Sequence, residues 1–144
     1  MDLQYVFASF GGRINRAKWW AGVIILLVIW LIVGGIFGSS LFGALIQVIV
    51  TLVLLYPAYA VCAKRFQDRD RPGKTALYGL VPILIASLLQ TWGLTGTSQN
   101  LNGLGWICFL INFGVGIWFL IDLGILRGTP GQNRYGGDPL AAIN

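Results

Sequence analysis

The residues of this chain that could do chemistry are almost all basic or aspartate side chains, because the sequence has no histidine and no glutamate. Its ten Lys and Arg residues are accompanied by five acidic residues and by two cysteines, Cys62 and Cys108, in different apolar runs. The absence of histidine excludes a histidine general base, a His-ligated haem and a His-based zinc site. No P-loop, dinucleotide-binding motif or Cys-rich metal motif occurs either. We therefore expect no metal site, no cofactor and no enzyme activity, and binding of anions is the chemistry left to the basic groups.

Half of the basic residues fall in one short stretch, residues 64–74, with the sequence KRFQDRDRPGK. Long uncharged apolar runs lie on both sides of it, so we predict a basic loop between two membrane spans. One interpretation is that this loop only sets the orientation of the protein in the membrane. The other is that it binds anionic lipid headgroups, for which each Lys or Arg near the surface contributes about 1 kcal/mol. Nucleic acid is not expected as a partner, because the stretch is short and mixed with aspartate.

The candidate residues divide into two groups. The first consists of basic side chains beside the expected spans that could bind anionic lipid or a partner: Arg13, Arg16, Lys64, Arg65, Arg71, Arg127 and Arg134. The second consists of polar side chains expected to pair structurally: Asp68, Asp122, Asn133 and Tyr135. Asp122 is the one charged residue inside an expected span, and a buried charge needs a partner, so we expect it to pair with a basic residue of the central loop.

The elements that position these residues are predicted from hydropathy. The chain has 144 residues, of which 56% are hydrophobic and only 10% charged, whereas soluble domains are about 45–50% apolar and about 25% charged. The uncharged runs predict a single transmembrane domain with four spans, at about 19–37, 41–63, 75–94 and 104–126, followed by a tail at 127–144. The third run is interrupted by Gly79, Pro82, Ser87 and Gln90, so we expect a bent or tilted helix there, with a re-entrant segment as the alternative.

The orientation follows from where the basic residues lie. All ten fall within residues 1–18, 64–74 and 127–144, and none lies in the two connections on the other side. Because loops rich in Lys and Arg stay in the cytoplasm, we predict an all-α, integral membrane four-helix bundle with both termini cytoplasmic. Cys62 and Cys108 would then lie near opposite faces of the membrane, too far apart for a disulfide.

Three segments of the chain resemble a known family. They are FGGRINRAKWW at residues 10–20, Pro57 followed by KRFQD at 64–68, and RGTPGQNRYGGDP at 127–139. Together they are similar to the domain of unknown function 805 family, the YhaH/YhaI-like bacterial inner-membrane proteins. The central segment departs from the family pattern, with Gln67, Pro72 and Lys74 where histidine, serine and tryptophan are expected. The resemblance implies a multi-pass four-span bundle in the bacterial inner membrane, and it implies no established activity.

These observations favour a non-catalytic accessory or structural component that binds anionic lipid and other integral membrane proteins, or further copies of itself. The first reason is that the sequence lacks the groups of side chains that catalysis needs. The second is that aromatic residues make up 13% of the chain, and only part of them can lie inside a four-helix bundle. The alternative is a small homo-oligomeric channel or transporter, whose pore would be lined by Gln47, Thr51 and Asn112. A lipid-modifying enzyme is a third hypothesis, and it would need Asp68 or Asp122 as an acid or base.

Overall fold

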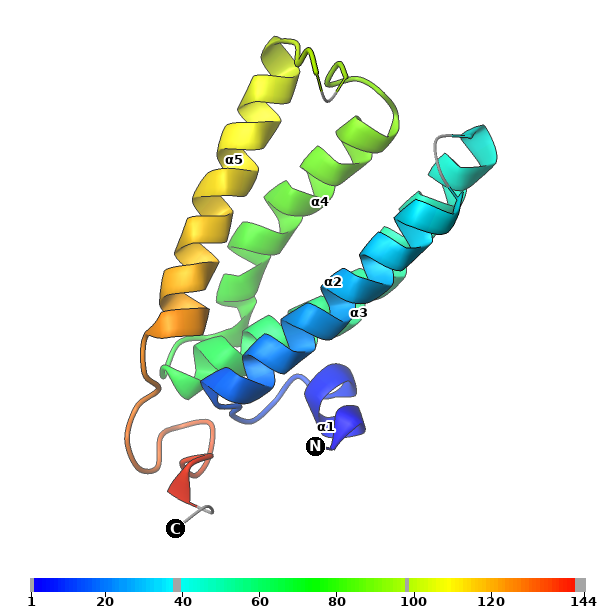
Figure 1. Ribbon diagram of the computed structural model, residues 1–144. Coiled ribbons are helices and arrows are strands. Elements are labelled where there is room, and N and C mark those ends of the chain that lie inside the picture. The colour runs from blue at the N-terminus through cyan, green and yellow to red at the C-terminus, as the bar shows by residue number, and fades with distance from the viewer. Residues whose placement is uncertain (1, 38–39, 98, 142–144) are drawn as a thin grey trace.

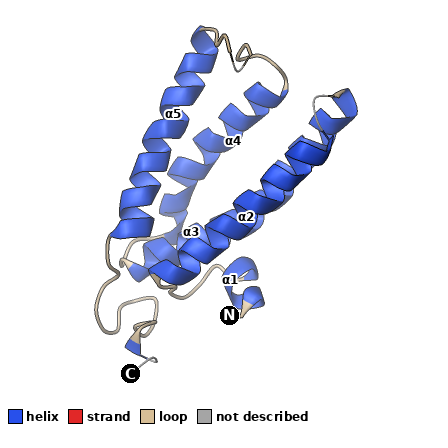
Figure 2. Ribbon diagram, viewed as in Figure 1, coloured by secondary structure: helices blue, strands red, loops and turns tan. Residues whose placement is uncertain are grey.

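The described part of the protein is built from helices alone, with no strand among its residues (Figure 2). The structure is a computed structural model that describes residues 2–37, 40–97 and 99–141. In chain order its elements are α1 (Leu3–Ala8), α2 (Arg16–Phe37), α3 (Leu41–Asp68), the 3-10 helix η1 (Gly73–Ala76), α4 (Leu77–Thr91), α5 (Gly103–Phe119) and the π-helix η2 (Leu120–Ile125). Four helical segments among these residues are long and apolar enough to cross a membrane: Arg16–Phe37, Leu41–Asp68, Gly73–Thr91 and Gly103–Ile125. The predicted all-α fold with four spans is confirmed.

Polar residues at the starts of the helices explain where several of them begin. Asp2, Ser40 and Asn102 each accept a hydrogen bond from a backbone N–H in the first turn of the helix that follows, at 3.0, 3.0 and 2.8 Å. Such caps satisfy donors that have no acceptor inside the helix. Ser40 and Asn102 begin the helices at the end of the molecule without basic residues, where uncharged side chains are the available caps.

The long helices form two hairpins, α2 with α3 and α4 with α5, that meet at one end of the molecule and diverge toward the other (Figure 1). Both termini lie at the end where the hairpins meet. We call this end, made of residues 2–18, 64–76 and 120–141, the charged end. The buried apolar core lies in this end and in the adjoining turns of the long helices, and consists of Val6, Ile14, Trp19, Val61, Cys62, Phe66, Ala76, Leu80, Phe119 and Leu123. Away from it the helices expose Leu, Ile, Val and Phe side chains, as helices surrounded by lipid do.

The structure corrects the expected boundary of the basic loop. α3 does not end near residue 63 but continues to Asp68, so residues 64–68 are helical and buried. The prediction assumed that charged side chains need water, whereas here they find partners in the N-terminal segment and the C-terminal tail. The connection between α3 and η1 is consequently short, and Asp70 adopts a positive φ of 58° within it.

The other elements differ less from expectation. The third run forms a continuous helical segment, Gly73–Thr91, which passes through Pro82. The fourth run continues α5 as the π-helix η2. The lead-in contains α1, and within the predicted tail residues 142–144 lie outside the described residues. Cys62 and Cys108 are both buried free thiols.

Candidate functional site

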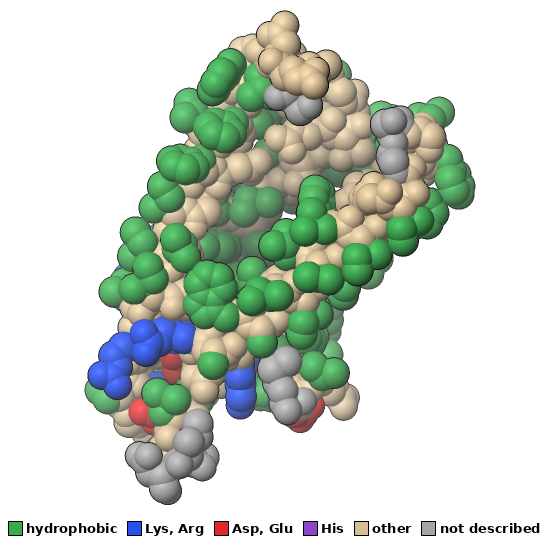
Figure 3. Space-filling model, viewed as in Figure 1, with side chains coloured by type: hydrophobic (Ala, Val, Ile, Leu, Met, Phe, Trp, Pro, Cys, Tyr) green, Lys and Arg blue, Asp and Glu red, His purple; other side chains and the backbone are tan. Residues whose placement is uncertain are grey.

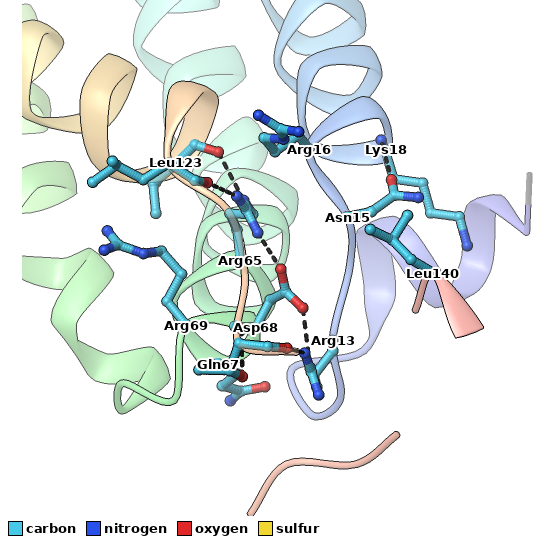
Figure 4. Close-up of polar contacts among 12 residues, drawn as sticks. Arg13, Asn15, Arg16, Lys18, Arg65, Gln67, Asp68, Arg69, Leu123 and Leu140 are labelled. Atoms are coloured by element: carbon cyan, nitrogen blue, oxygen red, sulfur yellow. Dashed lines mark hydrogen bonds and ion pairs between the residues drawn. The ribbon is translucent and has the colours of Figure 1, made fainter. Parts of the chain in front are cut away.

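Asp68 is the centre of a buried ion-pair network at the charged end (Figure 4). Its carboxylate accepts from the Nε of Arg13 at 3.0 Å and also pairs with Arg65, and all three side chains are at most 4% exposed. The backbone carbonyl of Asp68 accepts from the backbone N–H and the hydroxyl of Thr129, at 2.9 and 3.1 Å. One residue at the end of α3 therefore holds the N-terminal segment and the C-terminal tail together.

Arg13 binds the tail with the rest of its guanidinium group. Its Nη1 donates to the carbonyl oxygens of Gly131 at 2.6 Å and Gly136 at 3.2 Å, and its Nη2 donates to the carbonyl of Thr129. Because a planar guanidinium offers five N–H donors in a fixed geometry, one arginine can satisfy several carbonyls and one carboxylate at once. The tail is ordered against the helices through this side chain.

Arg65 and Lys64 cap the ends of two other helical segments. Arg65 donates from Nε to the carbonyl of Leu123 at 2.7 Å and from Nη2 to the carbonyl of Leu126, at the end of η2. Lys64 donates to the carbonyl oxygens of Tyr5 and Val6 in α1. Cations are favourable at carbonyl ends of helices, where acceptors are left without an intrahelical donor. The donors of both side chains are thus engaged inside the protein.

A second ion-pair group surrounds Asp122 in η2. Its carboxylate pairs with Arg69 and with Nη1 of Arg71 at 2.6 Å, and it accepts from the indole Nε1 of Trp118 at 3.0 Å. Burial, and then the like charge of Arg71, lower the pKa of Arg69, yet an arginine stays protonated at neutral pH. Asp68 and Asp122 are thus each paired with two arginines.

The tail carries further polar contacts. Asn133 donates from Nδ2 to the backbone carbonyl of Gln67 at 3.0 Å and to the hydroxyl of Thr129 at 2.9 Å. Tyr135 makes two local interactions: its N–H donates to Asn133 Oδ1 at 2.9 Å, and its ring lies against the guanidinium of Arg134. Arg134 forms an exposed ion pair with Asp70 at 3.0 Å.

Asp138 closes a turn of the tail. Its carboxylate accepts from the backbone N–H of Leu140 at 2.9 Å and from that of Gly131 at 3.1 Å. These two hydrogen bonds, that of Leu140 first, lower the pKa of Asp138 below its ordinary value because they stabilise the charged carboxylate.

A cavity of about 580 Å³, lined by charged and apolar residues, remains between the start of α2 and the tail. Arg16 and Arg127 line it, together with Asn15, Thr129 and Asp138, and the pair of Arg65 and Asp68 also contributes to its wall. Arg16 makes one exposed hydrogen bond, from Nη1 to the carbonyl of Ile125 at 2.9 Å. Arg127 has no hydrogen bond or ion pair with any residue in the described ranges. Among the described residues these two guanidinium groups are the exposed cationic groups that line the cavity, and the carboxylate of Asp138 lines it with them.

The structure thus separates the basic candidates. Arg13, Lys64 and Arg65 are buried and bonded within the protein, Arg71 and Arg134 are more exposed and paired with aspartates, and Arg16 and Arg127 line the cavity. Figure 3 shows Lys and Arg side chains gathered at the charged end, below a surface of hydrophobic side chains. Within the described residues no cluster of His, Cys, Asp or Glu could hold a metal ion.

Two residues of the network did not stand out in the sequence. Arg69, the partner of Asp122, was one basic residue among several in its stretch. Gly128 lies against the carboxylate of Asp68 so closely that a Cβ atom there would overlap it. The one signal for Gly128 was its place in the segment at 127–139, where glycine recurs.

Comparison with known proteins places the chain in a family. It is 32% identical over 139 residues to a protein of Escherichia coli strain K12 described as uncharacterized protein YiiR. The aligned residues make up 96% of this chain and 90% of the relative. It is 22% identical over 138 residues to inner membrane protein YhaH of the same strain, covering 92% of this chain and 88% of the relative. No solved structure matches the chain. A family model described as Protein of unknown function (DUF805) matches residues 7–137, and the chain belongs to that family.

Proposed function

We propose that this protein is a non-catalytic accessory or structural component of the bacterial inner membrane that binds anionic lipid at its charged end and there contacts other integral membrane proteins or copies of itself. The observation that carries the proposal is the cavity of about 580 Å³ lined by Arg16 and Arg127. Both guanidinium groups are exposed, and neither forms an ion pair with an aspartate among the described residues, unlike Arg13 and Arg65, although Asp138 also lines the cavity.

The start of α2 adds to the attraction for an anion. Asn15, Arg16 and Ala17 line the cavity, so the first turn of a long helix adjoins it. The first N–H groups of a helix have no acceptor within the helix and carry partial positive charge. Only that of Lys18 is taken, by Asn15 Oδ1 at 2.9 Å. A lipid phosphate fits this environment, because an arginine can bind two of its oxygens at once.

The lack of catalysis is part of the proposal. Asp68 and Asp122 were the candidate acids or bases, and each is held by two arginines. The channel hypothesis receives no comparable support. Gln47 and Thr51 lie in the α2–α3 hairpin, where Thr51 bonds to Trp30 and Gln47 lies beside Gly34, while Asn112 is on α5.

Native mass spectrometry tests the lipid site. The protein is extracted in mild detergent and titrated with phosphatidylglycerol or phosphatidylcholine, and the variant R16Q/R127Q is compared with K18Q/K74Q, which removes two basic side chains that do not line the cavity. Loss of two direct charge-assisted contacts to the phosphate, of at least about 1.5 kcal/mol each, should weaken phosphatidylglycerol binding by more than about a hundred-fold. The control should bind nearly as wild type.

Equal loss in both variants would show that only the total charge matters and would overturn the specific site. Foreign membrane proteins copurifying in fixed ratio would support the accessory role. A pure oligomer of this chain that conducts ions in liposomes would overturn that role in favour of a channel.

A further inference from the structure

A second, apolar cavity lies between the two hairpins. Its volume is about 670 Å³, and all four long helices line it, for example through Trp30, Leu55, Leu84 and Gly116. Figure 3 shows the hollow between the arms of the molecule, with hydrophobic side chains inside it. We call this cavity the cleft.

The cleft is closed at the charged end and open between α2 and α5. Trp19, Val61 and Phe119 of the buried core form its closed end. Above that level α2 and α5 stand apart: within the described residues no Cα atom of α2 lies within 8 Å of one in α5, although α2 contacts η2. Packed helices have axes about 8–10 Å apart, so the gap between α2 and α5 is an entrance. Because both helices are long enough to cross the membrane, this entrance faces hydrocarbon.

The lining offers little to a polar ligand. The indole N–H groups of Trp20 and Trp30 donate to the carbonyl of Gly124 at 3.4 Å and to the hydroxyl of Thr51 at 3.3 Å. The indole N–H of Trp19 is buried and has no hydrogen-bond partner among the described residues. The remaining lining consists mainly of Leu, Ile, Val, Ala and Phe side chains. An occupant must therefore be apolar.

Size distinguishes a lipid chain from a protein helix. A helix about 10 Å across with a rise of 1.5 Å per residue fills roughly 120 Å³ per residue, so the cleft would hold fewer than two turns. A spanning helix needs about 20 residues. A flexible chain one methylene wide can instead enter between α2 and α5 and fill the cleft. Gly116 leaves room for it, because nothing lies within 4 Å of where its Cβ would be.

Arg16 and Arg127, which line the first cavity, lie at the ends of the helical segments that flank the entrance. Arg16 begins α2, and Arg127 follows the end of η2, so the two side chains flank the foot of the gap between α2 and α5. We propose that one acyl chain of a phospholipid occupies the cleft, entering between α2 and α5, and that the phosphate of the same lipid lies at Arg16 and Arg127. The position of the headgroup rests on the proposed function, whereas the position of the chain rests on the cleft alone.

Photocrosslinking in nanodiscs tests the placement of the chain. The probe is phosphatidylglycerol with a diazirine in one acyl chain, diluted in unlabelled phosphatidylcholine, and crosslinked residues are mapped by mass spectrometry. In the wild-type protein we expect crosslinks on residues inside the cleft, such as Leu55 and Leu84. Crosslinks confined to the outer helix faces would overturn the proposal.

Two glycines on α5 provide a matched pair of variants. Gly116 lines the cleft and Gly114 does not, and a Cβ at either position meets nothing within 4 Å. G116F should fill the cleft and lower crosslinking inside it at least tenfold, while G114F should leave it unchanged. If G116F crosslinks inside the cleft as strongly as G114F, the chain site is wrong. Thermal unfolding of both variants checks that they are folded. The crosslinked residues of the wild-type protein test the chain site even if neither variant folds.

The same probe separates the two proposals. If R16Q/R127Q abolishes the preference for phosphatidylglycerol over phosphatidylcholine inside the cleft, one lipid bridges both cavities, as proposed. If cleft crosslinking persists with no headgroup preference even in the wild-type protein, the chain site stands and the anionic lipid site fails.

Discussion

Asp68 shows how a single carboxylate can organise distant segments of a chain. It joins Arg13 from the N-terminal segment, Arg65 from its own helix and Thr129 from the tail. Two buried guanidinium groups depend on it for charge compensation. Removing one partner of a buried ion pair is far more destabilising than replacing both partners by apolar residues, because it leaves a buried charge uncompensated.

We predict that D68N lowers the free energy of unfolding by about 3–5 kcal/mol, because it leaves Arg13 and Arg65 buried without a counter-charge. Asp70 supplies the control, since its pair with Arg134 is exposed and D70N should change stability by no more than about 1 kcal/mol. Thermal unfolding in detergent measures both. Similar melting temperatures for the two variants would mean that the network around Asp68 does not stabilise the fold.

Gly128 is predicted to be intolerant of any side chain. A Cβ there would overlap the carboxylate of Asp68, whereas a Cβ at Gly137 meets nothing within 4 Å. G128A should therefore displace the tail and destabilise the protein by about 1–3 kcal/mol, as overpacking does. G137A should be nearly neutral. Limited proteolysis of the tail, compared between the two variants, detects the displacement, and equal digestion would contradict the prediction.

Asp138 should make the tail sensitive to acid. Its folded pKa is lowered by hydrogen bonds from Leu140 and Gly131, so its contribution is present above the unfolded pKa of about 4 and is lost as the pH falls through the lower folded value. Hydrogen exchange of residues 129–141 should accelerate below about pH 4 in the wild-type protein. D138N should show a smaller change over the same range. An identical pH profile in both would rule out this role.

At the scale of elements, the charged end is a set of helix ends capped by side chains from α3. Lys64 donates to the carbonyl oxygens of Tyr5 and Val6 in α1, and Arg65 donates to those of Leu123 and Leu126 at the end of η2. α1 has only six residues, too few to be stable as an isolated helix in water. Its helical form depends on packing of Val6 and on these hydrogen bonds to a cation.

We predict that K64M releases α1 while leaving the long helices folded. Hydrogen bonds to charged groups contribute about 1.5–3 kcal/mol, so amide exchange in Leu3–Ala8 should increase by more than tenfold. Exchange in the middle of α3 should stay as in the wild type. K18M, which removes a lysine without a contact to α1 among the described residues, is the control. Unchanged protection of α1 in K64M would show that packing alone holds it.

At the scale of the whole molecule, the arrangement of two diverging hairpins places every Lys and Arg at one end. The same arrangement places the connection between α4 and α5 at the other end. By the tendency of basic segments to remain in the cytoplasm, the charged end should be cytoplasmic.

Cysteine labelling tests this orientation without interference from Cys62 and Cys108, which are buried. Gln99 and Lys74 are exposed and lie at opposite ends of the molecule. A membrane-impermeant maleimide should label Q99C in intact cells and K74C only after the membrane is opened. The reverse pattern would invert the topology, and labelling of both from outside would contradict four spans.

The sequence by itself determined the number of spans, the all-helical fold and the clustering of basic residues at one end. Each of these depends on local composition, because about 20 consecutive apolar residues suffice to favour the membrane whatever the rest of the chain does. The tertiary structure alone decided that Lys64, Arg65 and Asp68 continue a helix and are buried. Their partners at Tyr5, Arg13 and Leu123 are distant in sequence, so no local sequence pattern predicts these contacts. It also decided that the hairpins diverge and leave a cleft, because helix packing depends on which side chains meet in the core at the charged end.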